Sequence, residues 1–120
     1  MTTYVYMSHE DASFGYGRLV ANDDKQQPIY RIFAGCVNDW GAAGAIVGAT
    51  QPNILKEARA MLRDDKIILS PGIGAQGGEY KKALQIGADY GIIGRTITES
   101  SHPADLVTAL NRSGQSISPQ

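Results

Sequence analysis

The sequence predicts an α/β fold made of four strand–helix units whose strands run parallel. Three observations lead to this prediction. Short apolar runs lack polar alternation, most clearly at residues 67–69, which is typical of strands covered on both faces in parallel sheets. Segments with apolar residues at helical spacing follow these runs. A loop with four glycines, residues 72–78, comes directly after one run, at the strand end where such folds bind ligands.

Composition limits the class of protein. A chain of 120 residues with 42% hydrophobic content can form one core, which predicts a single domain over residues 1–120. Its 11 basic and 12 acidic residues give a net charge of −1 and no field to attract nucleic acid or an anionic membrane. One cysteine and two distant histidines predict no metal site. The lone cysteine and the lack of a membrane span or signal-peptide pattern predict a cytoplasmic protein.

The N-terminal third is predicted to contain one strand, one long loop and one helix. Residues 3–8 are rich in β-forming side chains and should form a strand. Residues 9–27 are polar, contain glycine and show no period, which predicts a long loop. Apolar residues then recur at helical spacing from Ile29 to Trp40, so we expect a helix with Pro28 in its first turn. Cys36 and Trp40 lie on this stripe and should pack in the core.

The remaining elements alternate regularly. Residues 44–48 should form a strand, followed by a helix over 52–63 with Pro52 in its first turn. After the strand at 67–69, helical spacing at residues 79–86 predicts the next helix, and residues 90–93 the fourth strand. Ser100 or Ser101 should cap the last helix, whose Leu106, Val107 and Leu110 face inward, and residues 111–120 should be a frayed tail.

The glycine loop is the strongest candidate for a binding site. Pro71 ends the strand, and the glycines that follow let the backbone approach a bound group and offer bare N–H groups to an anion. Residues 72–77 also fit G-x-G-x-x-G, the dinucleotide pattern. That pattern needs an acidic residue at the end of the next strand, whereas Asp89 precedes it. A dinucleotide loop and a plain connector remain alternatives.

Four strand–helix units are half of a (β/α)8 barrel of the TIM type, which has eight and normally about 200 residues or more. A half-barrel leaves two sheet edges without partners and its interior side chains uncovered. We therefore expect the chain to bind another half-barrel.

The motifs resemble those of orotidine 5′-phosphate decarboxylase, particularly its archaeal-type members. The matching segments are Met7-Ser8-His9, the loop SPGIGAQGG at residues 70–78 and IGRTI at 93–97, with a weaker match at 44–50; residues 10–27 have no counterpart. The resemblance implies that Gln76 and Arg95 bind the substrate's 5′-phosphate with N–H groups near Gly94. It implies that Ser8 bonds the pyrimidine edge, Pro71 walls the base, and residues 72–78, including Gly72 and Gly74, form a closing lid.

One departure from the resemblance concerns the chemistry. The family's proton-donating lysine lies in an Asp-x-Lys-x-x-Asp motif in the N-terminal half, and the fragments at residues 23–25 and 64–66 lack its closing aspartate. We interpret both as solvated charge. The chain then corresponds to the C-terminal, phosphate-binding half, with no catalytic residue of its own and no cofactor. Its partners would be orotidine 5′-phosphate or UMP and an N-terminal half-barrel chain. The alternative partner is a second copy of the chain. The alternative functions are a non-catalytic, self-associating half-barrel scaffold that binds phosphate, and a related sugar-phosphate barrel enzyme.

Overall fold

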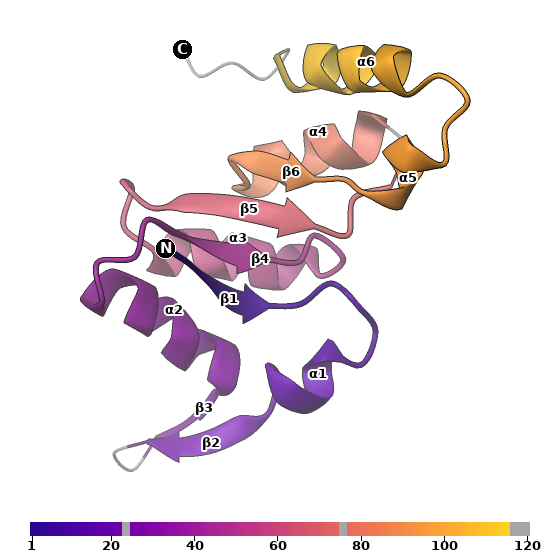
Figure 1. The fold of residues 1–120 in the computed structure, drawn as a ribbon. Helices are drawn as coiled ribbons and strands as arrows, with labels where there is room; N and C mark the ends of the chain where they lie inside the picture. The colour runs from indigo at the N-terminus through magenta and orange to yellow at the C-terminus, as the bar shows by residue number, and fades with distance from the viewer. Residues whose placement is uncertain (23–24, 75–76, 116–120) are drawn as a thin grey trace.

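The fold comes from a computed structural model, which describes residues 1–22, 25–74 and 77–115. Figure 1 shows the arrangement of its elements. In chain order they are β1 (Thr2–Tyr6), α1 (Ala12–Gly15), β2 (Leu19–Asn22), β3 (Lys25–Pro28), α2 (Ile29–Asp39), β4 (Gly44–Val47), α3 (Pro52–Met61), β5 (Ile67–Pro71), α4 (Gly77–Ile86), β6 (Tyr90–Ile92), α5 (Arg95–Thr98) and α6 (Pro103–Gln115).

The main sheet is parallel, as the sequence predicts. Its strands lie in the order β1-β4-β5-β6, and each neighbouring pair runs in the same direction. The strand ends differ from the predicted ones by one or two residues, and α4 begins two residues earlier than predicted. All four strands point the same way in Figure 1, so the loops that follow them gather at one edge of the sheet.

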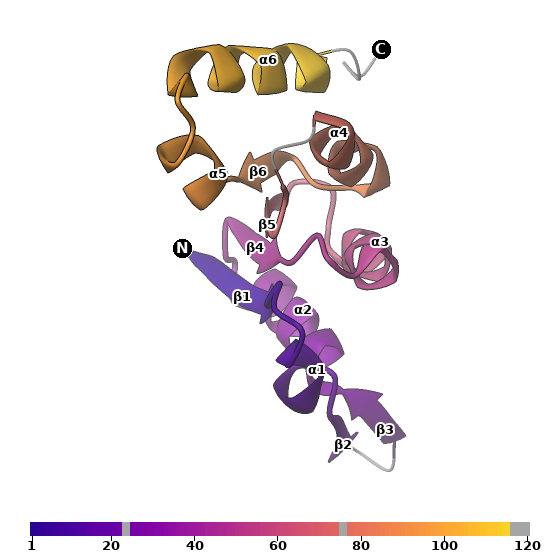
Figure 2. The same ribbon diagram turned by 90° about the vertical axis from the view of Figure 1, so that its right-hand side faces the viewer.

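The two faces of this sheet differ in burial. Helices α3 and α4 lie on one side of it (Figure 2), and α2 contacts β1 and β4. Residues pointing to that side are fully buried, among them Ala45, Ile68 and Ser70. On the other face, Tyr4 and Tyr90 are exposed. The face that bears Tyr4 and Tyr90 is thus the less covered of the two.

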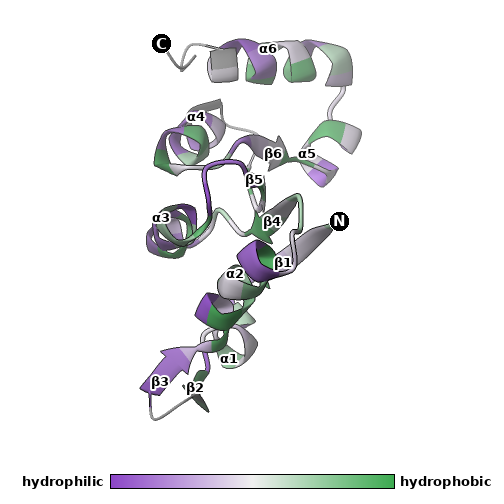
Figure 3. Cartoon of the chain, turned by 90° about the vertical axis from the view of Figure 1, so that its left-hand side faces the viewer, coloured by the Kyte–Doolittle hydropathy of each residue, from purple (hydrophilic) through white to green (hydrophobic). Residues whose placement is uncertain are grey.

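The prediction of a long loop over residues 9–27 is wrong. The segment contains the short helix α1 and the antiparallel hairpin β2–β3, in which Leu19 pairs with Pro28 and Val20 with Gln27. A hairpin makes its own hydrogen bonds, so it needs little apolar periodicity. In Figure 3, β3 is coloured as hydrophilic and β4 as hydrophobic. Tyr16 anchors the segment, since its ring lies 5.8 Å from that of Tyr6 and its carbonyl accepts from the Tyr30 N–H.

Helix α2 forms where predicted but buries a different stripe. Its buried residues are Tyr30, Ala34 and Val37, whereas Cys36 is only half-buried. Trp40 is 63% exposed, so its assignment to the core is wrong. The reason is its position after the last helical residue, where Gly41, with φ of 63°, turns the chain away.

The amino ends of the strands are held by a polar cluster. The Asp89 carboxylate accepts from the Ile68 N–H at 2.7 Å and pairs with Arg59 at 3.3 Å. Arg59 also donates to the carbonyls of Arg63 and Lys66. Lys66 is buried, not solvated as predicted, because its aliphatic stem packs while its amino group stays 3.8 Å from Asp65.

The C-terminal region differs from the prediction in two respects. The short helix α5 follows β6, and α6 continues to Gln115, so residues 111–115 are helical and not frayed. Residues 116–120 lie outside the described residues. Leu110 is buried as expected, whereas Val107 is partly exposed. The Ser100 hydroxyl accepts from the His102 N–H at 3.1 Å, just before α6 begins at Pro103.

Candidate functional site

Three predicted strand ends meet at one point, where Ser8, Thr50 and Gly72 form what we call the strand-end cluster. The Thr50 hydroxyl donates to the Ser8 carbonyl at 2.7 Å. Gly72 has φ of +84°, and a Cβ built on it would lie 2.6 Å from the Ser8 Cβ and 3.1 Å from the Thr50 methyl. Only glycine permits this approach without strain. The glycine loop is thereby placed against Ser8.

Hydrogen bonds between neighbouring strand ends hold the cluster in position. The Gly48 N–H donates to the Tyr6 carbonyl at 2.7 Å, and the Ala49 N–H donates to the Pro71 carbonyl at 2.8 Å. The buried Ser70 hydroxyl donates to the Val47 carbonyl at 2.5 Å. These bonds connect β1, β4 and β5 at their carboxyl ends, so the cluster rests on the sheet itself.

The glycine loop differs from the expectation in one contact. The Gly74 N–H is not bare, because it donates to the Glu79 carboxylate at 2.7 Å. Glu79 lies in the first turn of α4, where a negative charge is favourable. A carboxylate therefore occupies a donor that we predicted would face a bound anion. Gln76, predicted as a phosphate ligand, lies outside the described residues.

Gly94 and Arg95 follow β6 at the same edge of the sheet. The Gly94 carbonyl accepts the N–H groups of Ile97 and Thr98, which closes the single turn of α5. Arg95 is exposed, and within residues 1–22, 25–74 and 77–115 no carboxylate pairs with it. In the same part of the chain, no hydrogen bond joins Arg95 to the strand-end cluster. The guanidinium is thus open to solvent at the carboxyl edge.

A pocket of about 290 Å³ opens beside the strand-end cluster. It lies between the start of α3 and helix α4, and its lining includes Thr50, Gly72, Glu79 and Lys82.

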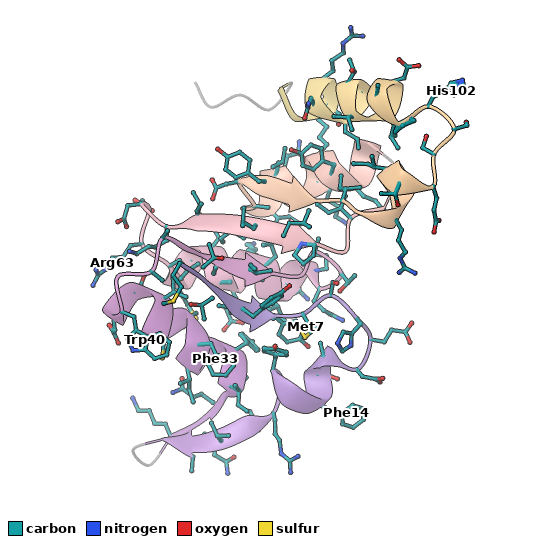
Figure 4. The ribbon with its side chains drawn as sticks, in the orientation of Figure 1. Met7, Phe14, Phe33, Trp40, Arg63 and His102 are labelled. Carbon is teal, nitrogen blue, oxygen red and sulfur yellow. The ribbon has the colours of Figure 1, made fainter. Side chains whose placement is uncertain are left out.

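Two labelled residues mark the two edges of the sheet in Figure 4. Met7 lies at the carboxyl end of β1, and Arg63 lies at the opposite edge. Among the described residues, no three His, Cys, Asp or Glu side chains are grouped as metal ligands. No described helix has the length and apolarity of a membrane span.

Sequence reasoning missed two polar residues of this region. Thr50 was expected near a helix cap, but its hydroxyl reaches back to Ser8. Its position directly after a strand, in the segment GAT, is the signal that could have indicated this role. Glu79 was assigned only to the helix dipole. Asp89 lies at the amino ends of the strands and bonds the Ile68 backbone, so it is not placed to meet a dinucleotide ribose near the glycine loop.

The parallel order of the strands, the helices on one face and the loops at the carboxyl ends define an α/β protein of the TIM-barrel type. Its sequence relatives are archaeal orotidine 5′-phosphate decarboxylases, to which the chain is homologous over the matched segments. The enzyme of Methanococcoides burtonii is 37% identical over 79 residues, which are 66% of this chain and 37% of that protein. The enzyme of Sulfurisphaera tokodaii is 55% identical over 60 residues, which are 50% of this chain and 28% of that protein.

Solved structures give the same relationship. The crystal structure of orotidine 5′-phosphate decarboxylase from Pyrococcus horikoshii superposes with a TM-score of 0.80 at 32% identity, covering 95% of this chain and 50% of that one. The enzyme of Metallosphaera sedula gives a TM-score of 0.67 at 28% identity, with 98% and 50% covered. A scan against protein-family models gives no match. The chain thus spans about half the length of these solved relatives.

Proposed function

We propose that this chain is the C-terminal, phosphate-binding half of an orotidine 5′-phosphate decarboxylase, which forms UMP and CO2 in pyrimidine synthesis. The observation that supports this most is the strand-end cluster, in which Ser8, Thr50 and Gly72 meet at the carboxyl ends of β1, β4 and β5. These positions belong to the motifs that resemble the family, and the relatives carry that name.

Each candidate residue has a role that its chemistry suits. Arg95 offers a guanidinium with parallel N–H donors that match phosphate oxygens, and Gln76 and the N–H groups near Gly94 add neutral donors. Ser8 forms a hydrogen bond with the edge of the pyrimidine, and Pro71 packs against the base. Residues 72–78 form a lid whose closure over the phosphate uses binding energy to organise the site. Gly74 takes part once its N–H leaves Glu79.

The chemical step requires a second half-barrel. The proton-donating lysine and its aspartates belong to the N-terminal half, so we assign no catalytic residue to this chain. Lys66 and Asp65 do not substitute for them, because they lie at the amino ends of the strands, away from the strand-end cluster. We propose that residues 1–120 form one cytoplasmic domain that needs no cofactor. Its partners are the nucleotide and an N-terminal half-barrel.

Titration with UMP tests the phosphate site directly. The purified chain should bind UMP, and Arg95→Ala should weaken binding about 10-fold to 100-fold, the size of a charge-assisted hydrogen-bonded contact. Arg63→Ala is the matched control, because Arg63 is an exposed arginine at the opposite edge of the sheet. An equal loss of UMP affinity in both variants would reject the site. If the chain bound ribulose 5-phosphate more tightly than UMP, the result would favour a sugar-phosphate enzyme.

Activity measurements test the division between the halves. The chain alone should not decarboxylate orotidine 5′-phosphate, and turnover should appear when an N-terminal half carrying Asp-x-Lys-x-x-Asp is added. Turnover by the purified chain that Arg95→Ala abolishes would show that the chemistry does not need the second half. A non-catalytic half-barrel that associates with itself is the second candidate, favoured by the exposed sheet face that bears Tyr4 and Tyr90.

A further inference from the structure

The face of the main sheet that points away from α3 and α4 is a continuous apolar surface. Tyr4, Ile46, Leu69 and Tyr90 pair directly across the four strands and therefore point to the same side. Ile67 lies two residues before Leu69 in β5, and Ile92 lies two residues after Tyr90 in β6, so both point to the same side as this row. Tyr4 is 49% exposed, Tyr90 59% and Ile92 42%. We call these six residues the open face.

The open face has no charge. Its six side chains are aromatic or aliphatic, and the other positions on the same side of the strands are Thr2, Gly44 and Pro71. Two such surfaces can meet without like-charge repulsion and without burying an unpaired ion. A continuous exposed apolar patch of this kind is typical of an interaction surface. The lack of charge therefore permits a second copy to cover the open face.

The exposed area is large enough for a stable pair. The chain exposes 7594 Å², whereas a folded monomer of this mass exposes about 6300 Å² by the usual scaling. The excess of about 1300 Å² belongs to the whole chain, and the open face contributes part of it. A pair that buried half of this excess on each chain would bury about 1300 Å² in total, within the range of stable protein–protein interfaces.

We propose that two copies of this chain close an eight-stranded parallel barrel around their open faces. Strands β1 and β6 are the two edges of the main sheet and run in the same direction. A two-fold axis along the barrel axis brings β6 of each copy beside β1 of the other. Both edges then gain hydrogen-bonded partners at once, which removes the unpaired edges that an open parallel sheet leaves.

This arrangement rests on the second candidate of the proposed function, a half-barrel that associates with itself, and adds how the two copies join. It depends on the open face and the strand edges and not on phosphate binding. It has one consequence for the site. Since the axis runs along the strands, the carboxyl ends of all eight strands lie at one end of the barrel. Two identical strand-end clusters, one from each copy, would share that end.

Light scattering during size-exclusion chromatography tests the pairing. The molar mass measured for the purified chain should be twice the 12.8 kDa of a single chain. Tyr90→Lys and Ile92→Lys each place a charge on the open face and should give monomers. Phe14→Lys is the matched control, because Phe14 is 78% exposed but belongs to α1, away from the sheet, and it should remain a dimer. A monomeric wild-type chain, or equal dissociation in all three variants, would overturn the proposal.

Hydrogen exchange distinguishes a closed barrel from two sheets stacked face to face, and it needs no variant that folds. In the wild-type dimer, edge pairing should protect the amides of β1 and β6 about as strongly as those of β4 and β5. Fast exchange in β1 and β6 of a dimer would show that the edges are unpaired and would reject barrel closure. Neither light scattering nor hydrogen exchange involves UMP. A failure of the pairing proposal is therefore distinguishable from a failure of the proposed phosphate site.

Discussion

Gly72 is the residue whose backbone conformation most directly fixes the candidate site. Its φ of +84° and the 2.6 Å between its ideal Cβ and the Ser8 Cβ leave no room for a side chain. Gly72→Ala should therefore lower the free energy of unfolding by about 1–3 kcal/mol, the cost of a strained backbone at a non-glycine residue. Urea denaturation followed by circular dichroism measures the change. UMP binding should weaken in parallel, because Ser8 is displaced.

Gly35 supplies the matched control for this prediction. It lies inside helix α2, and a Cβ built on it meets no atom within 4 Å. Gly35→Ala should raise the free energy of unfolding by about 0.5–1 kcal/mol, because alanine loses less backbone freedom in a helix. If both substitutions changed stability in the same direction, steric fit at Gly72 would not be the cause.

Glu79 competes with an anion for the glycine loop. Its carboxylate accepts the Gly74 N–H at 2.7 Å and lies beside the strand-end cluster. Glu79→Gln removes the charge and keeps an acceptor, so affinity for UMP should rise about twofold to fivefold, the size of a partly screened charge interaction. Calorimetric titration with UMP measures it. Asp65→Asn, which changes an exposed carboxylate at the amino ends of the strands, should leave affinity unchanged.

At the scale of elements, helices α2 and α3 are joined by one carboxylate. The Tyr30 hydroxyl donates to Glu57 at 2.7 Å, and the Arg31 guanidinium bonds the same carboxylate. Burial, followed by the hydrogen bond and charge of Glu57, raises the pKa of Tyr30 above its ordinary value of 10.0. Glu57 likewise raises the pKa of Arg31. The neutral phenol is therefore the form that the folded chain favours.

This link gives a pH dependence with a definite sign. Because the pKa of Tyr30 is raised in the folded chain, its contribution is fully present below about pH 10, the ordinary tyrosine value, and is lost as pH rises through the folded value. Above about pH 10, wild-type stability should fall more steeply than that of Tyr30→Phe. Urea midpoints of the two proteins measured above about pH 10 give the difference, and parallel curves there would contradict it.

The predictable elements are those with long-range periodicity. The parallel strands and the helices after them follow from apolar runs and helical spacing, because each must cover a face of one sheet. The hairpin β2–β3 could not be found in this way, since its own backbone bonds form it and its side chains are largely polar. Trp40 and Lys66 were misassigned because burial at an element's end depends on how the chain turns there.

The candidate site was predictable where a motif fixes the backbone and unpredictable where a side chain reaches across the fold. Glycine at residue 72 and serine at residue 8 were identified from sequence, and the structure brings them together. The Thr50 hydroxyl bonds a residue 42 positions away, and its place directly after a strand indicates that it lies near the site but not which residue it contacts. The bond from Gly74 to Glu79 was missed for a different reason. Sequence shows which donors a loop has, but not which of them an internal acceptor already occupies.

At the scale of the molecule, the chain is more extended than a compact domain of its length. Its radius of gyration is 15.2 Å, whereas a compact chain of this length has about 13.6 Å. Its extents are 52 × 34 × 23 Å, and the shortest of them leaves room for the sheet and one layer of helices. The helices complete one layer of a barrel wall, and the sheet's other face remains to be covered.

Because the open face and the strand edges can be covered only once, an N-terminal half-barrel and a second copy must compete for them. Adding the N-terminal half of the Pyrococcus horikoshii enzyme, whose structure matches this chain over 50% of its length, should convert the homodimer to a one-to-one complex. Light scattering measures the species, and decarboxylation should appear only in the mixed complex. A complex that retains both copies of this chain would show that the two partners use different surfaces. Tyr90→Lys should prevent both associations, whereas Phe14→Lys should leave both intact, because closure around the same interior is what each partner provides.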